Sequence, residues 1–170
     1  MTAAAMVLAL AVVAGAAAAG FLLRRRQAPR AAYAGSRRVL VPFSGALDPT
    51  VLDAAIRIAR AEEAVLVPAY LLVVPLQYAE DSARKEQVAV ALPLLEAVEQ
   101  TALRARVPVD ARIEKGRSPT HALRRLWEEE QFDRIVAPAT GFSPKELTWI
   151  LTHAPAETVV LRPAPPVRAA

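Results

Sequence analysis

The 170-residue sequence contains no cysteine, only two histidines and few aromatic residues. Without cysteine, a disulfide framework, a thiolate metal site and a cysteine nucleophile are all excluded. Acidic residues are also missing from residues 1–38, which carry six of the 21 lysines and arginines. The other 15 basic residues face 17 acidic ones, so the formal net charge of +4 belongs to the N-terminal segment. A nearly neutral remainder argues against a nucleic-acid-binding domain, because such domains usually carry their own basic face.

The N-terminal segment is apolar and long enough to cross a bilayer. Residues 1–23 carry no charge, and 3–23 as a helix would span about 31 Å, close to the hydrocarbon thickness. A cleaved signal peptide would carry basic residues before the run, and a soluble helix would have one polar face. Neither feature is present. We therefore expect a transmembrane signal anchor over 1–23, inserted through 3–23.

A basic linker follows the expected anchor. Arg24-Arg25-Arg26 directly follow the apolar run, and basic residues flanking a span stay on the cytoplasmic side. We expect a single-pass protein of the cell membrane whose folded part faces the cytoplasm. Residues 24–36 are too short and polar to fold alone and form the juxtamembrane linker. The folded domain then covers 37–163, and 164–170 form a flexible tail.

Apolar runs and amphipathic segments alternate through the rest of the chain. The pattern predicts strands at 39–41, 65–74, 107–114, 134–137 and 158–161, with helices at 49–61 and 82–106 and others starting at Ser118-Pro119 and Ser143-Pro144. Because strands and helices alternate, we expect an α/β fold with an open parallel sheet and helices on both faces.

Three local features refine this expectation. Residues 107–114 alternate apolar and polar side chains, which predicts an edge strand with Pro108, Asp110, Arg112 and Glu114 on a solvated face. Pro68 suggests a bulge or a shifted boundary in the second strand, and Pro93 should kink or restart the long helix. The last helix should bury Leu147, Ile150 and Leu151.

The turn after the first strand is the first place to look for a ligand. Ser44-Gly45 form this turn, and Asp48 and Pro49 are suited to cap and start the next helix. In open α/β sheets, ligands bind at the carboxyl ends of central strands, where the crossovers change direction.

Five segments in this order resemble the universal stress protein family over about 38–163. They are Val39-Leu40-Val41-Pro42, residues 66–75, residues 114–119, Asp133-Arg134-Ile135-Val136, and His153-Ala154-Pro155 ahead of residues 159–162. The resemblance implies a five-stranded parallel sheet, for which we expect the order 3-2-1-4-5, and a homodimer through the last strand, 158–161. It also implies two kinds of members, those that bind ATP and those that do not.

The sequence departs from the ATP-binding members of that family. Those members carry an aspartate after the first strand and a Gly-x-x-Gly…Gly-(Ser/Thr) signature after the fourth, because glycines let the backbone approach phosphates. In this sequence Ser44 replaces the aspartate, Pro138 replaces the first glycine, Gly141 matches the second, and Pro144-Lys145 lies where Gly-(Ser/Thr) belongs. We therefore expect no ATP bound in the family's usual way, and no metal or other cofactor. The residual nucleotide cleft would be lined by Pro42, Phe43, Ser44, Leu71, Thr140 and Gly141.

No catalytic set accompanies these residues. His121 and His153 have no second ligand or acid pattern nearby in the sequence, and Ser44 lies in no nucleophile elbow. We expect a non-catalytic regulatory module, similar to the stress-type domains attached to membrane transporters, with a transporter-like protein as partner and no nucleic acid. The alternative is a sensor that binds ATP or a cyclic dinucleotide in the altered cleft.

Overall fold

The computed structural model describes residue 33, residues 35–79 and residues 85–162. The predicted anchor 1–23, most of the linker 24–36 and the tail 164–170 lie outside these residues. The chain divides between Ala34 and Gly35, and every helix and strand described below belongs to the second part. Within the described ranges, no helix combines the length and apolar character needed to span a bilayer.

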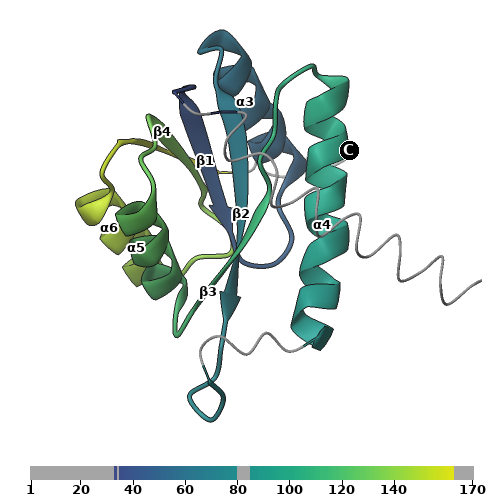
Figure 1. Cartoon of the computed structure of the whole chain (residues 1–170). Helices are drawn as coiled ribbons and strands as arrows, with labels where there is room; N and C mark the ends of the chain where they lie inside the picture. Colours follow the sequence, from purple (N-terminus) through teal and green to yellow (C-terminus); the bar gives the residue numbers. More distant parts are fainter. Residues whose placement is uncertain (1–32, 34, 80–84, 163–170) are drawn as a thin grey trace, which may run out of the picture. The chain divides into compact units, whose positions relative to one another are not determined.

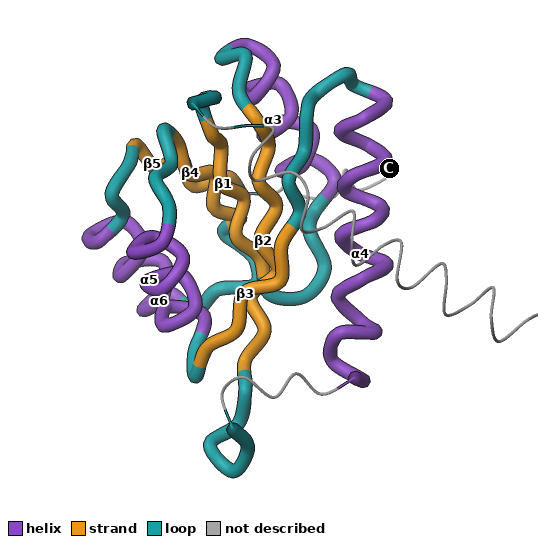
Figure 2. The backbone as a smooth tube through the Cα atoms, in the orientation of Figure 1, coloured by secondary structure: helices purple, strands orange, loops and turns teal. Residues whose placement is uncertain are grey.

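Five parallel strands alternate with four helices in the described residues. The strands are β1 (Arg38–Phe43), β2 (Val65–Val73), β3 (Arg112–Gly116), β4 (Arg134–Pro138) and β5 (Glu157–Leu161). The helices are α3 (Pro49–Ala61), α4 (Lys85–Arg104), α5 (Pro119–Glu129) and α6 (Pro144–His153). The sheet has the order β3-β2-β1-β4-β5, with α3 and α4 on one face and α5 and α6 on the other (Figures 1 and 2). The predicted fold class and strand order are confirmed.

The central strand β1 has no polar face because it is covered on both sides. Val39, Leu40 and Val41 are fully buried, as their unbroken apolar run indicates. Val39 and Val41 pack in one cluster with Val51 and Ala55 of α3. The apolar residues of β1 therefore place this strand in the middle of the sheet and also form the surface against which α3 packs.

The third strand begins at Arg112 and not at the start of the predicted 107–114. An isolated bridge at Leu66 precedes the β2–β3 ladder, which resumes at Ala69 opposite Arg112 in the same register. Pro68 lies in the gap and has no N–H to donate to a neighbouring strand. Pro68 therefore leaves β2 continuous without a bulge, but it interrupts the pairing with β3, so that β3 begins only at Arg112.

One prediction about the helices needs correction. Leu151 is 56% exposed, contrary to the expectation that it is buried, whereas Ile150 is fully buried and Leu147 is half-buried. Pro93 lies within α4, which continues on both sides of it as one helix, so the helix does not restart there. The tryptophans Trp127 and Trp149 stack with their ring centroids 5.3 Å apart and so join α5 to α6.

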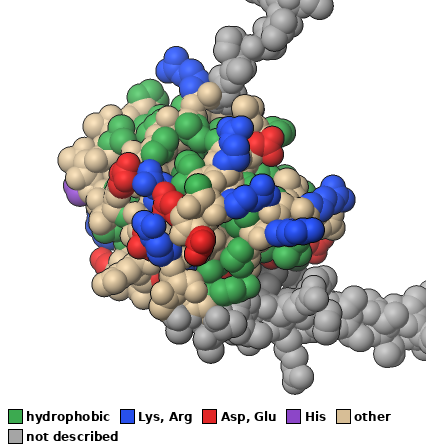
Figure 3. Space-filling view, turned by 90° about the horizontal axis from the view of Figure 1, so that it is seen from above, with side chains coloured by type: hydrophobic (Ala, Val, Ile, Leu, Met, Phe, Trp, Pro, Cys, Tyr) green, Lys and Arg blue, Asp and Glu red, His purple; other side chains and the backbone are tan. Residues whose placement is uncertain are grey.

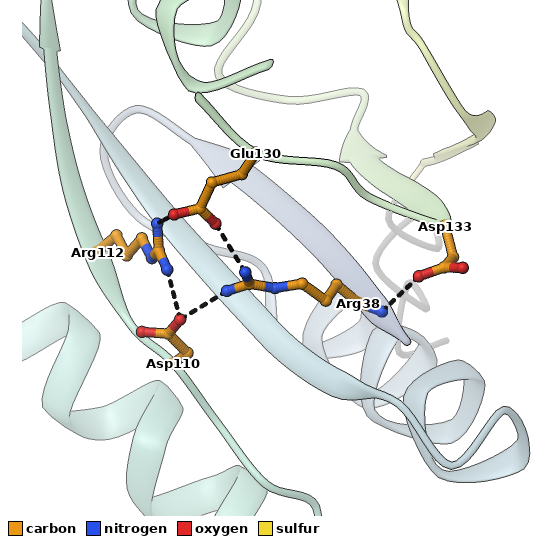
Figure 4. Close-up of polar contacts among 5 residues, drawn as sticks. All are labelled: Arg38, Asp110, Arg112, Glu130 and Asp133. Carbon is orange, nitrogen blue, oxygen red and sulfur yellow. Dashed lines mark hydrogen bonds and ion pairs between the residues drawn. The ribbon is translucent and has the colours of Figure 1, made fainter. Parts of the chain in front are cut away.

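The predicted solvated face of the third strand is exposed only in part, because Pro108 is exposed and Glu114 half-buried, whereas Asp110 and Arg112 are buried. Asp110 is 4% exposed, and it lies 2.7 Å from Arg38 and 2.6 Å from Arg112. Glu130 closes a ring by pairing with Arg112 and with Arg38, the latter at 2.8 Å (Figure 4). Burial alone disfavours the charge of Arg112, but hydrogen bonds to Asp110 and Glu130 outweigh this and raise the pKa of its guanidinium. We call these four residues the charge ring.

Loss of one member of the charge ring should cost far more than a surface ion pair. Asp110→Ala leaves two buried guanidinium groups short of a partner, and we expect it to lower the free energy of unfolding by about 3–5 kcal/mol. Urea unfolding followed by circular dichroism measures this change. Glu157→Ala, which removes an exposed partner of Arg134, is the matched control and should cost less than about 1 kcal/mol. Equal losses in the two variants would contradict the assignment.

Candidate functional site

The loops after β1 and β4 touch at the carboxyl end of the sheet. These neighbouring strands send their crossovers outward to β2 and β5, so the loops mark the topological switch point. The Ser44 hydroxyl donates a hydrogen bond of 2.8 Å to the Gly141 carbonyl. Gly141 has a φ of +90°, and an added Cβ would lie 3.4 Å from the Ser44 carbonyl oxygen. A glycine is therefore suited to this close contact.

The structure separates the six predicted cleft residues into two groups. Pro42, Phe43 and Leu71 are buried in β1 and β2, and the Phe43 ring packs edge-on against Tyr70 with Leu95 in the same cluster. Ser44, Thr140 and Gly141 lie in the two loops and are at least partly exposed. The structure thus brings Ser44 and Gly141 together, with Thr140 beside them, and places Phe43 in the core.

The start of α6 already holds a carboxylate from its own chain. One Glu146 oxygen (Oε2) accepts hydrogen bonds of 2.7 Å from the Ser143 N–H and 2.8 Å from its hydroxyl. In return the Ser143 hydroxyl accepts from the Glu146 N–H at 3.3 Å, which completes a capping box. An anion at this position is stabilised by the helix dipole, as a bound phosphate would be.

The start of α3, on the β1 side of the switch point, also carries a carboxylate, here from the N-cap residue Asp48 itself. Asp48 accepts a hydrogen bond of 2.8 Å from the Thr50 N–H. Hydrogen bonding to Thr50 lowers the pKa of Asp48, so its carboxyl group is charged at neutral pH. Both helices that start from the loops at the switch point therefore carry a negative charge at their N-termini.

Within the described residues, some backbone amides of the two loops at the switch point have no hydrogen-bond acceptor. The Ala139 N–H donates to the Leu161 carbonyl at 2.7 Å, whereas within the described residues the amides of Thr140 and Gly141 have no hydrogen-bond acceptor. Pro138 has no N–H at all. In the loop after β1, the amides of Gly45, Ala46 and Leu47 likewise have no acceptor among the described residues, so both loops offer amides that could hold a small anion.

The other candidate side chains already have local partners. The His121 ring accepts at Nδ1 from the Arg117 N–H at 3.3 Å, and one Arg117 guanidinium nitrogen donates to the carbonyls of Val74, Pro75 and Tyr78. His153 ends α6 and stacks on Trp149, with ring centroids 5.0 Å apart. In the part of the chain that the structure describes, no cluster of three or more histidine, aspartate or glutamate side chains could hold a metal ion.

Sequence reasoning found the capping box but missed its effect on the site. The motif Ser143-Pro144-Lys145-Glu146 predicts a helix start. The same four residues also place an acid, Glu146, directly after the Pro144-Lys145 pair that lies where the ATP-binding signature has Gly-(Ser/Thr). That coincidence is visible in the sequence and could have been noted as a signal against phosphate binding.

Comparison with known proteins gives a family and a set of similar folds. A model of the universal stress protein family matches residues 35–161. A search among curated proteins finds no match. The chain is similar to the universal stress protein UspA from Lactobacillus plantarum, with 20% identity and a TM-score of 0.56, over 75% of this chain and 98% of that one.

Two further similar structures contain nucleotides. A universal stress protein in complex with cAMP is 21% identical, with a TM-score of 0.58 over 74% of this chain and 97% of that one. A universal stress protein family member from Arabidopsis thaliana with AMP bound is 15% identical, with a TM-score of 0.56 over 75% of this chain and 92% of that one. At these identities the similarity shows a shared fold. Because the family model covers well over half of the 170 residues, the chain belongs to the universal stress protein family.

Proposed function

We propose that this chain is a membrane-anchored, non-catalytic regulatory module that does not bind ATP in the usual way of its family. The observation that carries the proposal is the Glu146 carboxylate at the start of α6. It takes the Ser143 amide that a phosphate would need, and its charge repels a phosphate. Pro138 and Pro144 remove two further amide donors from the same loop.

The absence of catalysis is inferred from the partners of the candidate nucleophile. The Ser44 hydroxyl donates a hydrogen bond to the Gly141 carbonyl, and a backbone carbonyl cannot act as a general base. A serine nucleophile needs a histidine or another base within hydrogen-bond distance. His121 of α5 instead accepts a hydrogen bond from the Arg117 N–H in the preceding turn, and the His153 ring is hydrogen-bonded to the Trp149 carbonyl within α6.

Membrane anchoring is proposed from the sequence. The apolar run 3–23 and the arginines that follow it have the length and charge order of a signal anchor with a cytoplasmic domain. In such a location the module would act by contact with a membrane protein, such as a transporter, and not by diffusing through the cytoplasm.

We also propose a homodimer through β5. This strand lies at the edge of the sheet next to β4, and Val159, Val160 and Leu161 are only half-buried. An edge strand with apolar side chains is suited to pairing with a second copy.

Sedimentation equilibrium of the full chain in detergent tests the dimer. We expect a monomer–dimer equilibrium that shifts to monomer when Val160 is replaced by lysine, because a charge at the edge opposes pairing. Ala46→Lys, in the exposed loop after β1, is the control and should leave the equilibrium unchanged. A chain that stays monomeric at every concentration would contradict the dimer.

The second candidate function is a nucleotide sensor. The free amides of Thr140 and Gly141 favour it, as do similar structures determined with cAMP, dAMP or AMP bound. A nucleoside monophosphate or cyclic nucleotide carries fewer phosphates than ATP, so it needs fewer donors and meets less repulsion from Glu146.

Calorimetric titration of the full chain in detergent with ATP, AMP, cAMP and a cyclic dinucleotide separates the two functions. We expect no heat of binding for ATP up to about 1 mM, which corresponds to less than about 4 kcal/mol of binding free energy. Submillimolar binding of ATP would contradict the proposal that the chain is a module that does not bind ATP in the usual way. Submillimolar binding of one of the other three would favour the sensor.

A variant tests the physical reason for the weak binding. Glu146→Gln removes the carboxylate charge while keeping an acceptor for the Ser143 N–H, and we expect ATP affinity to rise about fivefold, as removal of ~1 kcal/mol of repulsion predicts. The matched control is Glu128→Gln on the exposed end of α5, which should leave ATP affinity unchanged. If Glu146→Gln did not raise the affinity for ATP, repulsion by the Glu146 carboxylate would not be the reason for the weak binding.

A further inference from the structure

A group of arginines gathers at the amino edge of the sheet, opposite the candidate site. Helices α3 and α4 both end at this edge, and the Arg60 guanidinium donates a hydrogen bond to the Ala105 carbonyl just after α4. In Figure 3, which looks onto this edge, the basic side chains gather on the side of α3 and α4. We define the basic patch as Arg57, Arg60, Arg104 and Arg106, all of them exposed.

The charge of the basic patch is not neutralised by ion pairs. Within the described residues, Arg57, Arg104 and Arg106 have no acidic partner. The neighbouring acids Glu62, Asp133 and Glu157 at this edge are paired with Arg37 or Arg134, and the exposed Glu63 is the remaining acid at the end of α3. The near-neutral average of the domain thus conceals a local excess of positive charge.

An apolar side chain lies within the basic patch. Leu103, directly before Arg104, is 60% exposed at the end of α4. Arg106 follows with a φ of +59°, where glycine is favoured, and its N–H donates to the Leu103 carbonyl at 2.9 Å. The helix therefore ends in a tight cap that presents an arginine where the backbone would prefer glycine. An exposed leucine among arginines is typical of surfaces that lie at a membrane interface.

Arg37, the residue before β1, lies at the same edge of the sheet as the end of α3. Arg37 pairs with Glu62, the residue that caps α3, and its carbonyl accepts from the Val65 N–H at 2.8 Å. The 11 residues of 24–34 can reach at most about 36–40 Å when fully extended. If 3–23 is a membrane anchor, this edge of the domain stays within that distance of lipid headgroups, which raises their effective concentration.

We propose that the basic patch docks onto the anionic surface of the membrane that holds the anchor. The inference rests on the proposed anchor and adds a second, electrostatic contact made by the folded domain itself. The arginines attract anionic headgroups, and Leu103 enters the interface between them. With the amino edge held against the membrane, the carboxyl edge with Ser44 and Gly141 remains accessible to a partner.

The absence of cysteine makes a site-specific test possible. The full chain carrying Gln100→Cys, one turn before Arg104, is labelled with an environment-sensitive fluorophore and reconstituted in vesicles. A second labelled chain carries Leu76→Cys, which reports from the exposed loop after β2 at the carboxyl edge. Vesicles contain either phosphatidylcholine alone or phosphatidylcholine with phosphatidylglycerol, in 0.1 M or 1 M salt.

We expect a blue shift of the label at residue 100 with anionic vesicles in 0.1 M salt only, because 1 M salt shortens the screening length to about 3 Å. The label at residue 76 should not shift. Arg104→Gln/Arg106→Gln should lower the docking equilibrium constant about 30-fold, at about fivefold for each arginine, which is ~1 kcal/mol each. The matched control, Lys145→Gln/Arg162→Gln at the carboxyl edge, should retain the shift.

Different outcomes separate the anchor from the basic patch. Failure of the full chain to float with neutral vesicles in 1 M salt would overturn the anchor. Flotation without a lipid-dependent shift at residue 100 would overturn the docking proposal and leave the anchor intact. A shift caused by duplex DNA or polyglutamate, but not by anionic vesicles, would likewise overturn it and assign the patch to a soluble polyanion.

Discussion

The charge ring of Arg38, Asp110, Arg112 and Glu130 connects the parts of this domain that the chain keeps far apart. Arg38 starts the central strand, Asp110 and Arg112 lie at the start of β3, and Glu130 follows α5. Each charge is mostly removed from water, and each has two oppositely charged neighbours, so the desolvation of all four is compensated only when the ring is closed. Any shift in register of β3 or in the seating of α5 would leave charges buried without partners.

The two edges of the sheet differ in how their charged groups are arranged. At the amino edge, strand starts and helix ends bring many charges together, and most of the acids there pair within the charge ring or with Arg37 and Arg134, whereas Glu63 is exposed. The arginines at the ends of α3 and α4 have no such acidic partners among the described residues. At the carboxyl edge, the acids Asp48 and Glu146 occupy the two helix starts at the switch point.

The carboxyl edge therefore has the topological switch point of an open α/β sheet, and the chain's own groups occupy much of it. The Ser44–Gly141 hydrogen bond joins the two loops that would have to enclose a ligand. Internal carboxylates occupy helix starts that would otherwise hold phosphate, and two prolines remove amides. A surface of this kind is less suited to a triphosphate than one whose helix-start amides are free.

The sequence by itself determined the fold, because the apolar run at Val39–Leu40–Val41, the helix starts at Asp48, Ser118 and Ser143, and the alternation of elements depend on local chemistry that the chain carries. The sequence also determined which amides are missing near the switch point, since Pro138 and Pro144 have no N–H wherever they are placed. Only the tertiary structure decided that Asp110 and Arg112 are buried, because their burial depends on Arg38 and Glu130, which are distant in sequence. Likewise, the contact of Ser44 with Gly141 and the grouping of the arginines from α3 and α4 arise where separate elements end at the same edge of the sheet, and no local pattern encodes that meeting.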